Sequence, residues 1–263
     1  MTGRAVEPLS AYVLTRDSER LLDRVLPPLS RVADEVLVLD SGSRDRTIEI
    51  ARRHGCRVET SEFKGFSRQR QKAQSLCTYD HVLFIDSDEI MSDELVAEIL
   101  ALKEAGFPAD AYTIRRDWFV LGKPVHAFYP VQSPDYPIRI LDRRRVDFAT
   151  SNEVHETASG YRSIQRIEKP LTHLTCATKD EVETKLKLYS SLAAADLRAS
   201  GRAIPARPLV LGRSLVAFVK WYFGKGAWMD GGVGLRAGVF AARYTYLKYE
   251  RARLIDQPQH AVP

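Results

Sequence analysis

Three acidic residues close together are the strongest chemical signal in the sequence: Asp86, Asp88 and Glu89 directly follow the apolar run 82–85. Such a run is typical of a strand buried on both faces of a parallel sheet, where ligands bind at the carboxyl ends of the strands. One-residue spacing places Asp86 and Asp88 on the same side of an extended chain, and unpaired carboxylates are costly to bury. The pair could therefore hold a divalent cation that bridges to a diphosphate. The alternative is an ordinary strand end before a helix that starts at Ser92.

The elements before this motif must position it. Apolar runs at residues 9–15 and 36–39 predict two more buried strands. Helical spacing begins at Leu21, and we expect that helix to stop at Pro27. The alternation of strands and helices predicts an α/β domain with right-handed crossovers around a mainly parallel sheet.

The later part of the chain changes character. Strands without intervening helices are expected from Asp110, and the proline-rich segment 123–137 predicts an irregular loop. From Lys179 onward, apolar residues at helical spacing predict a C-terminal helical region. We therefore expect a catalytic domain over residues 1–178 and a helical region over 179–263. Arginine and lysine on aromatic-rich faces make that region suitable for an anionic membrane surface, and packing on the catalytic domain or a second subunit is the alternative.

Composition restricts the class of protein. The 263 residues carry a net charge of +5, which suits an anionic small molecule or membrane face and is too weak to indicate nucleic acid. Cys56, Cys77 and Cys176 are scattered, so buried reduced thiols of a cytosolic protein are expected. The stretch MTGRAVEPLS has no apolar core of signal-peptide length, and no apolar stretch has the length of a membrane span.

Four stretches in order resemble family 2 glycosyltransferases of the GT-A fold, a Rossmann-like nucleotide-sugar transferase fold. They lie within residues 9–175 and read LSAYVLTRDSER, LVLDSGSRDRT, FSRQRQKA and FIDSDE. Three more stretches resemble bacterial lipopolysaccharide-core β-glucosyltransferases: VHE at 154–156, THL at 172–174 and GAWMDGGVG at 226–234. The resemblance implies a GT-A catalytic domain with a C-terminal helical extension.

The resemblance also implies a donor site. It assigns Asp40 to the imide hydrogen of a uracil-type base, and the alternative is an aspartate that forms a turn. Thr15 and Arg16 should line the same pocket, although an Arg-Asp pair follows Thr15 where the family has Asn-Glu. Arg68 and Arg70 point in different directions on a helix, so one could reach base or phosphate while the other faces water.

The metal site follows from the same resemblance. Asp88 should ligate Mg²⁺ or Mn²⁺ directly, with Asp86 on the ribose or on a metal-bound water and Ser87 between them in the donor site. The metal would neutralise the departing diphosphate. His173 is the candidate for a third protein ligand, since imidazole favours Mn²⁺ over Mg²⁺, and the alternative is a structural histidine.

Inversion at the anomeric carbon requires a base for the proton of the acceptor hydroxyl. Glu156 is the first candidate and Glu153 the second. The alternative is a surface cluster of acids, because exposed glutamate is common.

These expectations favour an inverting hexosyltransferase that moves glucose from a UDP-sugar to a lipopolysaccharide-core or other lipid-linked acceptor. It would act in the cytoplasm at the inner face of the cytoplasmic membrane, and a homo-oligomer is left open. The alternative acceptors are a polyprenyl phosphate, an exopolysaccharide or a protein. A nucleotidylyltransferase is disfavoured because TRDSER lacks the glycine of its phosphate loop, and an inactive nucleotide-binding scaffold is disfavoured by the complete set of acids.

Overall fold

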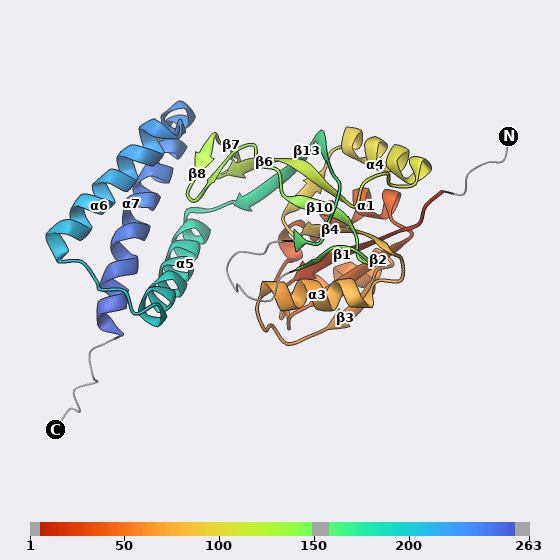
Figure 1. Cartoon of the computed structure of the whole chain (residues 1–263), viewed down its shortest axis with the longest axis horizontal. Coiled ribbons are helices and arrows are strands. Elements are labelled where there is room, and N and C mark those ends of the chain that lie inside the picture. The colour runs from red at the N-terminus through yellow and green to blue at the C-terminus, as the bar shows by residue number, and fades with distance from the viewer. Residues whose placement is uncertain (1–5, 149–157, 256–263) are drawn as a thin grey trace, which may run out of the picture. The chain divides into compact units, whose positions relative to one another are not determined.

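The computed structural model describes residues 6–148 and 158–255, and the chain forms two compact units (Figure 1). The N-terminal unit comprises Met1–Arg116 and Tyr136–His173. The C-terminal unit comprises Asp117–Asp135 and Leu174–Pro263. The predicted domain boundary at residue 178 stays a prediction, and the contacts group residues 117–135 with the C-terminal helices.

Nine strands of the described chain form one mixed sheet, in the order β3-β2-β1-β4-β10-β6-β13-β5, with β7 paired to β6. The strands before the acidic motif are parallel to one another, and β10 runs antiparallel to both β4 and β6. The members are β1 (Leu9–Thr15), β2 (Glu35–Asp40), β3 (Arg57–Thr60), β4 (His81–Asp86), β5 (Glu89–Met91), β6 (Ala111–Val120), β7 (Lys123–Pro124), β10 (Ile138–Asp142) and β13 (Ile164–Cys176). Two small sheets pair β8 (Ala127–Phe128) with β9 (Val131–Gln132), and β11 (Asp147–Phe148) with β12 (Ala158–Ser159).

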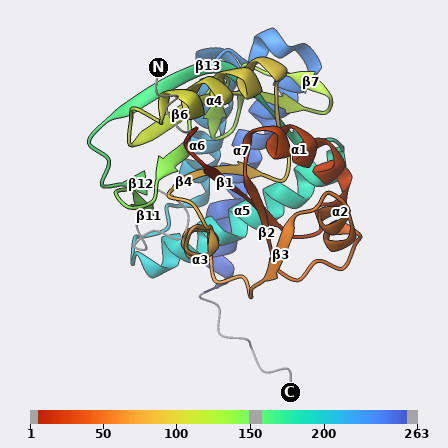
Figure 2. The ribbon, with the colours of Figure 1, turned by 90° about the vertical axis from the view of Figure 1, so that its right-hand side faces the viewer.

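Helices cover both faces of the parallel strands. Figure 2 shows α1 (Glu19–Val32) and α4 (Asp93–Ala105) above the strands and α3 (Phe66–Leu76) below them. The short α2 (Thr47–Arg53) packs against α1. Because both faces are covered, the apolar residues of β1 and β4 are buried except for half-buried Leu14, with Tyr12 stacked on Phe84 at a ring distance of 5.5 Å. The three cysteines are buried free thiols, as expected, and burial raises the pKa of Cys77 to about 12.

Helix ends follow the sequence in one case and depart from it in another. Ser92 caps α4 by accepting the backbone N–H of Leu95 at 3.1 Å, and Gly106 closes the helix with φ of 72°. The expected stop at Pro27 is wrong, because α1 continues to Val32. The carbonyls that lose their donors belong to exposed residues, where water can replace the lost hydrogen bonds, while burial of later apolar residues stabilises the final turns.

The C-terminal unit is helical. Its helices are α5 (Lys179–Ala199), α6 (Arg207–Val219), the π-helical turn η1 (Lys220–Gly224), the 3₁₀ turn η2 (Ala227–Asp230) and α7 (Gly231–Leu254). α7 packs against both α5 and α6. At Gly234 a Cβ atom would lie 1.6 Å from the carbonyl oxygen of Ala227, so the glycine-rich segment lets α7 begin close against η2. None of the described helices combines the length and the apolar character needed to cross a membrane.

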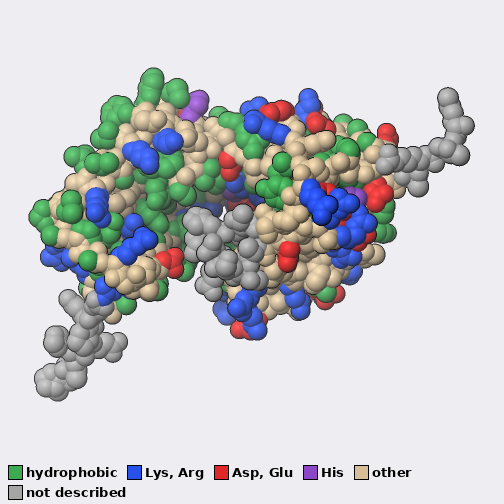
Figure 3. Space-filling view, viewed as in Figure 1, with side chains coloured by type: hydrophobic (Ala, Val, Ile, Leu, Met, Phe, Trp, Pro, Cys, Tyr) green, Lys and Arg blue, Asp and Glu red, His purple; other side chains and the backbone are tan. Residues whose placement is uncertain are grey.

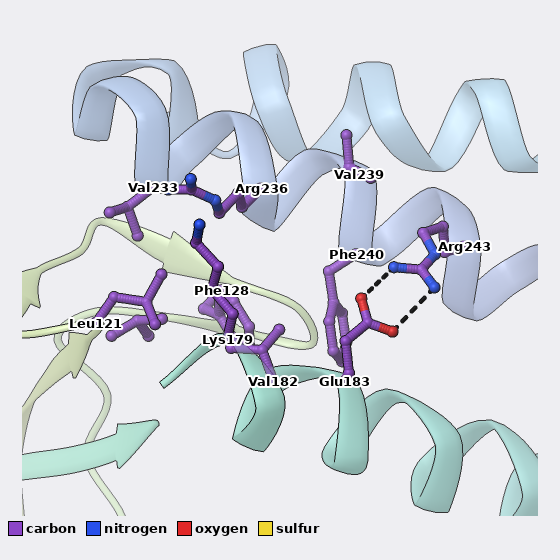
Figure 4. A pocket seen from close by; sticks show the side chains of 11 residues that line it. Leu121, Phe128, Lys179, Val182, Glu183, Val233, Arg236, Val239, Phe240 and Arg243 are labelled. Carbon is purple, nitrogen blue, oxygen red and sulfur yellow. Dashed lines mark hydrogen bonds and ion pairs between the residues drawn. The ribbon is translucent and has the colours of Figure 1, made fainter. Parts of the chain in front are cut away.

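A pocket of the C-terminal unit lies between α5, α7 and the adjoining strands (Figure 4). Its apolar lining includes Leu121, Phe128 and Phe240. Beside it, Arg243 of α7 forms an ion pair with Glu183 of α5, with Nη2 2.9 Å from Oε2. The guanidinium of Arg251 donates to the hydroxyl of Ser190 at 2.6 Å. These two arginines of α7 therefore help to hold α5 in place.

Candidate active site

The carboxyl ends of β1, β2 and β4 meet at one edge of the sheet. The parallel register places Thr15 beside Asp40 and Leu14 beside Asp86. This is the edge at which α/β sheets bind ligands, so the folding of three separate apolar runs assembles the predicted donor-site residues.

Asp40 is completely buried at this edge. Its carboxylate accepts hydrogen bonds from the backbone N–H groups of Gly42 and Ser43, at 2.9 and 2.8 Å, and from the hydroxyl of Thr15 at 3.0 Å. The hydroxyl of Ser43 is a fourth donor. Four donors match the lone-pair sites of a carboxylate, as the turn-forming alternative requires. A contact of Asp40 with a nucleobase would displace one of them and stays a prediction.

Hydrogen bonds tie the three strand-end loops together. Ser18, after β1, donates to the hydroxyl of Ser87, after β4, at 3.0 Å. The backbone N–H of Asp17 donates to the hydroxyl of Ser43, after β2, at 2.8 Å. Arg16 is exposed at the same edge, so its side chain is accessible to a bound anion.

Asp86 lies among arginines. Its Oδ1 is 3.0 Å from Nη2 of Arg70, and its Oδ2 is 2.8 Å from Nη2 of Arg139. Both guanidinium groups also lie over the ring of Phe84, at 4.9 and 5.2 Å from its centroid. Burial alone would raise the pKa of Asp86, but the positive charges of Arg139 and Arg70 hold it well below its usual value. Asp86 is therefore a carboxylate at neutral pH.

Glu89 completes this group, which we call the arginine cluster: Asp86 and Glu89 with Arg70, Arg116 and Arg139. Glu89 is fully buried, and Arg139 binds it through two nitrogens, at 3.0 and 2.5 Å. Arg116 adds a contact of 2.8 Å. Because buried Glu89 has a bidentate arginine partner and a second arginine contact, the cost of removing its charge from water is compensated, while Asp86 is 31% exposed.

Asp88 lies in a different environment. Its Oδ2 is 3.2 Å from Nε2 of His173, which β13 brings to this point by pairing His173 with Glu89 of β5. The side chain of Asp88 is 25% exposed. The fold thus joins two of the three predicted metal ligands across 85 residues of sequence, while the oxygens of Asp86 contact Arg70 and Arg139. Over residues 6–148 and 158–255, three or more His, Cys, Asp or Glu side chains do not gather into a cluster able to hold a metal ion.

The two arginines of α3 divide as their spacing predicts. Arg70 is buried in the arginine cluster, whereas Arg68 is exposed. A direct contact of either with a donor stays a prediction. Glu153 and Glu156, the candidate bases, lie outside the described residues.

The model of a family described as "Glycosyl transferase family 2" matches residues 10–166 of the 263. The chain belongs to glycosyltransferase family 2. The match covers all the strand-end motifs of this glycosyltransferase and ends before His173.

Two relatives illustrate the similarity in sequence. An uncharacterized glycosyltransferase of Rickettsia conorii is 37% identical over 99 residues, which are 38% of this chain and 35% of the relative. The chain thus matches about a third of the length of that protein. The lipopolysaccharide core biosynthesis glycosyltransferase LpsC of Rhizobium meliloti is 25% identical over 265 residues and covers 95% of both chains. This similarity confirms the predicted resemblance to lipopolysaccharide-core enzymes.

A solved structure confirms the fold class. A mannosyltransferase from Pyrobaculum calidifontis, solved with GDP-Man and Mn²⁺, has a TM-score of 0.54 and covers 96% of this chain and 89% of its own. Its sequence identity is 15%, so the comparison carries the fold alone. The predicted GT-A fold with C-terminal helices is therefore correct.

Sequence analysis did not identify Arg116 and Arg139 of this glycosyltransferase. A signal for Arg139 was present, because it stands inside the apolar strand Ile138–Asp142. A charged residue in a buried strand requires a partner of opposite charge. In the structure, the partners of Arg139 are two carboxylates of the acidic motif, Asp86 and Glu89.

Proposed function

We propose that this glycosyltransferase is an inverting enzyme that moves a hexose, glucose, from a UDP-sugar to a lipopolysaccharide-core or other lipid-linked acceptor. The observation that carries the proposal is the Asp88–His173 pair beside the carboxyl ends of β1, β2 and β4. The acceptor class is supported by the Rhizobium relative, which aligns over 95% of both chains.

Asp88 and His173 would hold a divalent metal. Their oxygen and nitrogen atoms lie 3.2 Å apart at an accessible strand end, and these two ligand types suit Mn²⁺ better than Mg²⁺. Two protein ligands leave coordination positions for diphosphate oxygens and water, which is the usual arrangement at nucleotide sites. When bound, the metal would neutralise charge on the departing diphosphate.

The residues of the chain perform the other steps. The exposed guanidinium of Arg16 could bind donor phosphate at the strand edge. Glu156, with Glu153 as the second candidate, would accept the proton of the acceptor hydroxyl while that oxygen attacks the anomeric carbon opposite UDP. The arginine cluster fixes the strand end on which Asp88 lies, through the hydrogen bond from the backbone N–H of Asp86 to Glu89 at 3.1 Å.

The enzyme would act in the cytoplasm at the inner face of the cytoplasmic membrane, where a lipid-linked acceptor is anchored. The basic and aromatic C-terminal helices support this location, because cations near anionic lipid contribute about 1 kcal/mol each.

Thermal melting with UDP, GDP and Mn²⁺ tests the donor site. A ligand that binds only the folded state raises the melting temperature, so UDP with Mn²⁺ should raise it more than either alone, and more than GDP with Mn²⁺. Hydrolysis of a panel of UDP- and GDP-sugars then identifies the sugar. A shift with GDP but not with UDP would overturn the UDP assignment, and no shift with any nucleotide would overturn the donor site.

A further inference from the structure

Helix α6 has two contrasting faces. Val210, Ser214 and, in the following turn, Trp221 are buried. α6 packs against α7 so closely that a Cβ atom at Gly238 would lie 3.0 Å from the ring of Phe218. This inner face accounts for the attachment of α6 to the C-terminal unit.

The opposite face is apolar and exposed. Leu211, Leu215, Val219 and Phe223 recur every four residues and line one side of the helix, with Val216 beside them. The exposed fractions of these five side chains lie between 47% and 65%. Figure 3 shows hydrophobic side chains gathered over α6, at the left of the view. We call these five residues the outer face of α6. Contiguous exposed apolar residues are typical of a surface that binds another body.

The charges around this face indicate which kind of surface binds it. The segment 207–229, which contains α6, η1 and most of η2, carries Arg213, Lys220 and Lys225, together with Arg207, which pairs with Glu250 of α7, and it has no acidic residue. Within the described part of the chain, Lys220 has no charged partner. A second copy docked through the same face would bring like charges together, which is unfavourable. An anionic lipid surface complements both the apolar side chains and the cations.

We propose that the outer face of α6 docks the enzyme on an anionic lipid bilayer. The 13 residues of α6 span about 20 Å, less than the ~30 Å of a bilayer core, so the helix lies in the plane of the interface. The inference deepens the proposed function, on which it rests for the need to reach a lipid-linked acceptor. It moves the membrane contact from the cations of α7 to α6, because Arg243 and Arg251 of α7 bind residues of α5.

Cosedimentation with vesicles tests this surface. The native chain should bind vesicles of phosphatidylethanolamine and phosphatidylglycerol, bind less at high salt, and bind neutral phosphatidylcholine vesicles weakly. The double substitution Leu215→Ser and Val219→Ser should lower vesicle binding by about tenfold or more. Transfer of one large apolar side chain from water into the bilayer strengthens binding by at least that factor. Both positions are exposed, so the melting temperature should be unchanged.

A matched control lies on α5. Leu188 and Leu192 are also four residues apart and are 54% and 46% exposed, on a helix that carries several acids. Leu188→Ser with Leu192→Ser should leave vesicle binding unchanged. Equal loss in both double variants, or no loss in the α6 variant, would overturn the proposal. The proposal would also be overturned if the native chain formed a dimer that did not bind vesicles and if the α6 substitutions dissociated that dimer.

The docking surface and the transfer reaction can be separated experimentally. The variant Asp88→Ala should bind vesicles as the native chain does, because Asp88 belongs to the N-terminal unit. A chain that binds vesicles through α6 but hydrolyses no sugar nucleotide would refute the proposed function alone. A chain that hydrolyses a donor but ignores anionic vesicles would refute the docking surface alone.

Discussion

Two regions of the acidic motif differ in how they hold their carboxylates. In the arginine cluster, Asp86 and Glu89 contact guanidinium groups from α3, β6 and β10, and Glu89 is fully buried. Asp88, between them in sequence, is 25% exposed, and its Oδ2 lies 3.2 Å from Nε2 of His173. The side chain of Asp86 is 31% exposed, so the two aspartates differ in the charge of their neighbours and not in burial.

The difference separates two roles. Fully paired buried charges hold a structure in place, and removing one partner leaves an uncompensated charge. A carboxylate beside an imidazole, without a guanidinium fixed on it by a second buried carboxylate, can instead exchange its partner for a metal ion. We therefore expect substitutions in the arginine cluster to act on stability, and substitutions at the Asp88–His173 pair to act on turnover.

Asp88→Ala should give the largest effect. It should reduce sugar transfer to background and remove the Mn²⁺-dependent part of UDP binding, because Asp88 is the proposed metal ligand. The free energy of unfolding should change by about 1 kcal/mol or less, as for other partly exposed pairs. Initial rates, calorimetric titration with UDP and chemical denaturation measure the three quantities. Turnover at the native rate in the presence of EDTA would show that the metal assignment is wrong.

Glu156→Gln should have the next largest effect. The substitution keeps the size of the side chain but cannot accept a proton, so the chemical step should slow by about 10²–10⁴-fold. UDP affinity should be unchanged, since the base acts on the acceptor. Single-turnover rates with Glu153→Gln as the matched control decide between the two candidates. A normal rate in Glu156→Gln with a collapse in Glu153→Gln would transfer the role to Glu153.

Arg139→Met should act on stability. It leaves the buried carboxylate of Glu89 without its bidentate partner, so the free energy of unfolding should fall by about 3–5 kcal/mol. Arg31→Met is the matched control, because Arg31 pairs with Asp93 at 2.5 Å on the exposed surface. That control should cost about 0–1 kcal/mol. If urea denaturation showed equal losses of unfolding free energy in the two variants, the ion pairs of the arginine cluster would be no more stabilising than a surface ion pair.

The acid limb of the stability curve gives a smaller effect from the same cluster. The lowered pKa of Asp86 means that its contribution is present above the unfolded pKa of about 3.9 and is lost as pH falls. Below that pH the unfolded chain binds one proton more, so stability should rise by about 1.4 kcal/mol per pH unit from this group. Asp86→Asn should reduce the slope by that amount. An unchanged slope would mean that other carboxylates dominate the acid limb.

The sequence was informative where local chemistry decides the structure. The apolar runs of β1 and β4 and the caps Ser92 and Gly106 followed from residue type alone. The course of α1 beyond Pro27 did not, because burial of residues late in the helix outweighs the local preference.

The site shows the same limit. The edge that carries Asp40, Asp86 and Asp88 was predictable, since parallel strands end together. The identity of their partners was not: the apolar strand shows that Arg139 needs an acid, but the strand pairings that bring Arg116 and Arg139 to Asp86 and Glu89 are long-range. The long-range pairing of strands, and not the local sequence motif, decides which acidic residue forms structural ion pairs.

Arg68→Ala should give the smallest effect and completes the comparison on α3. Arg68 is exposed and Arg70 is buried in the cluster, although only one residue separates them. Removal of Arg68 should change the free energy of unfolding by about 0.5 kcal/mol or less, as for ordinary surface substitutions. Denaturation and the KM for the donor are the two measurements. Unchanged stability with a raised KM would place Arg68 on the donor, whereas a large loss of stability would contradict its exposed position.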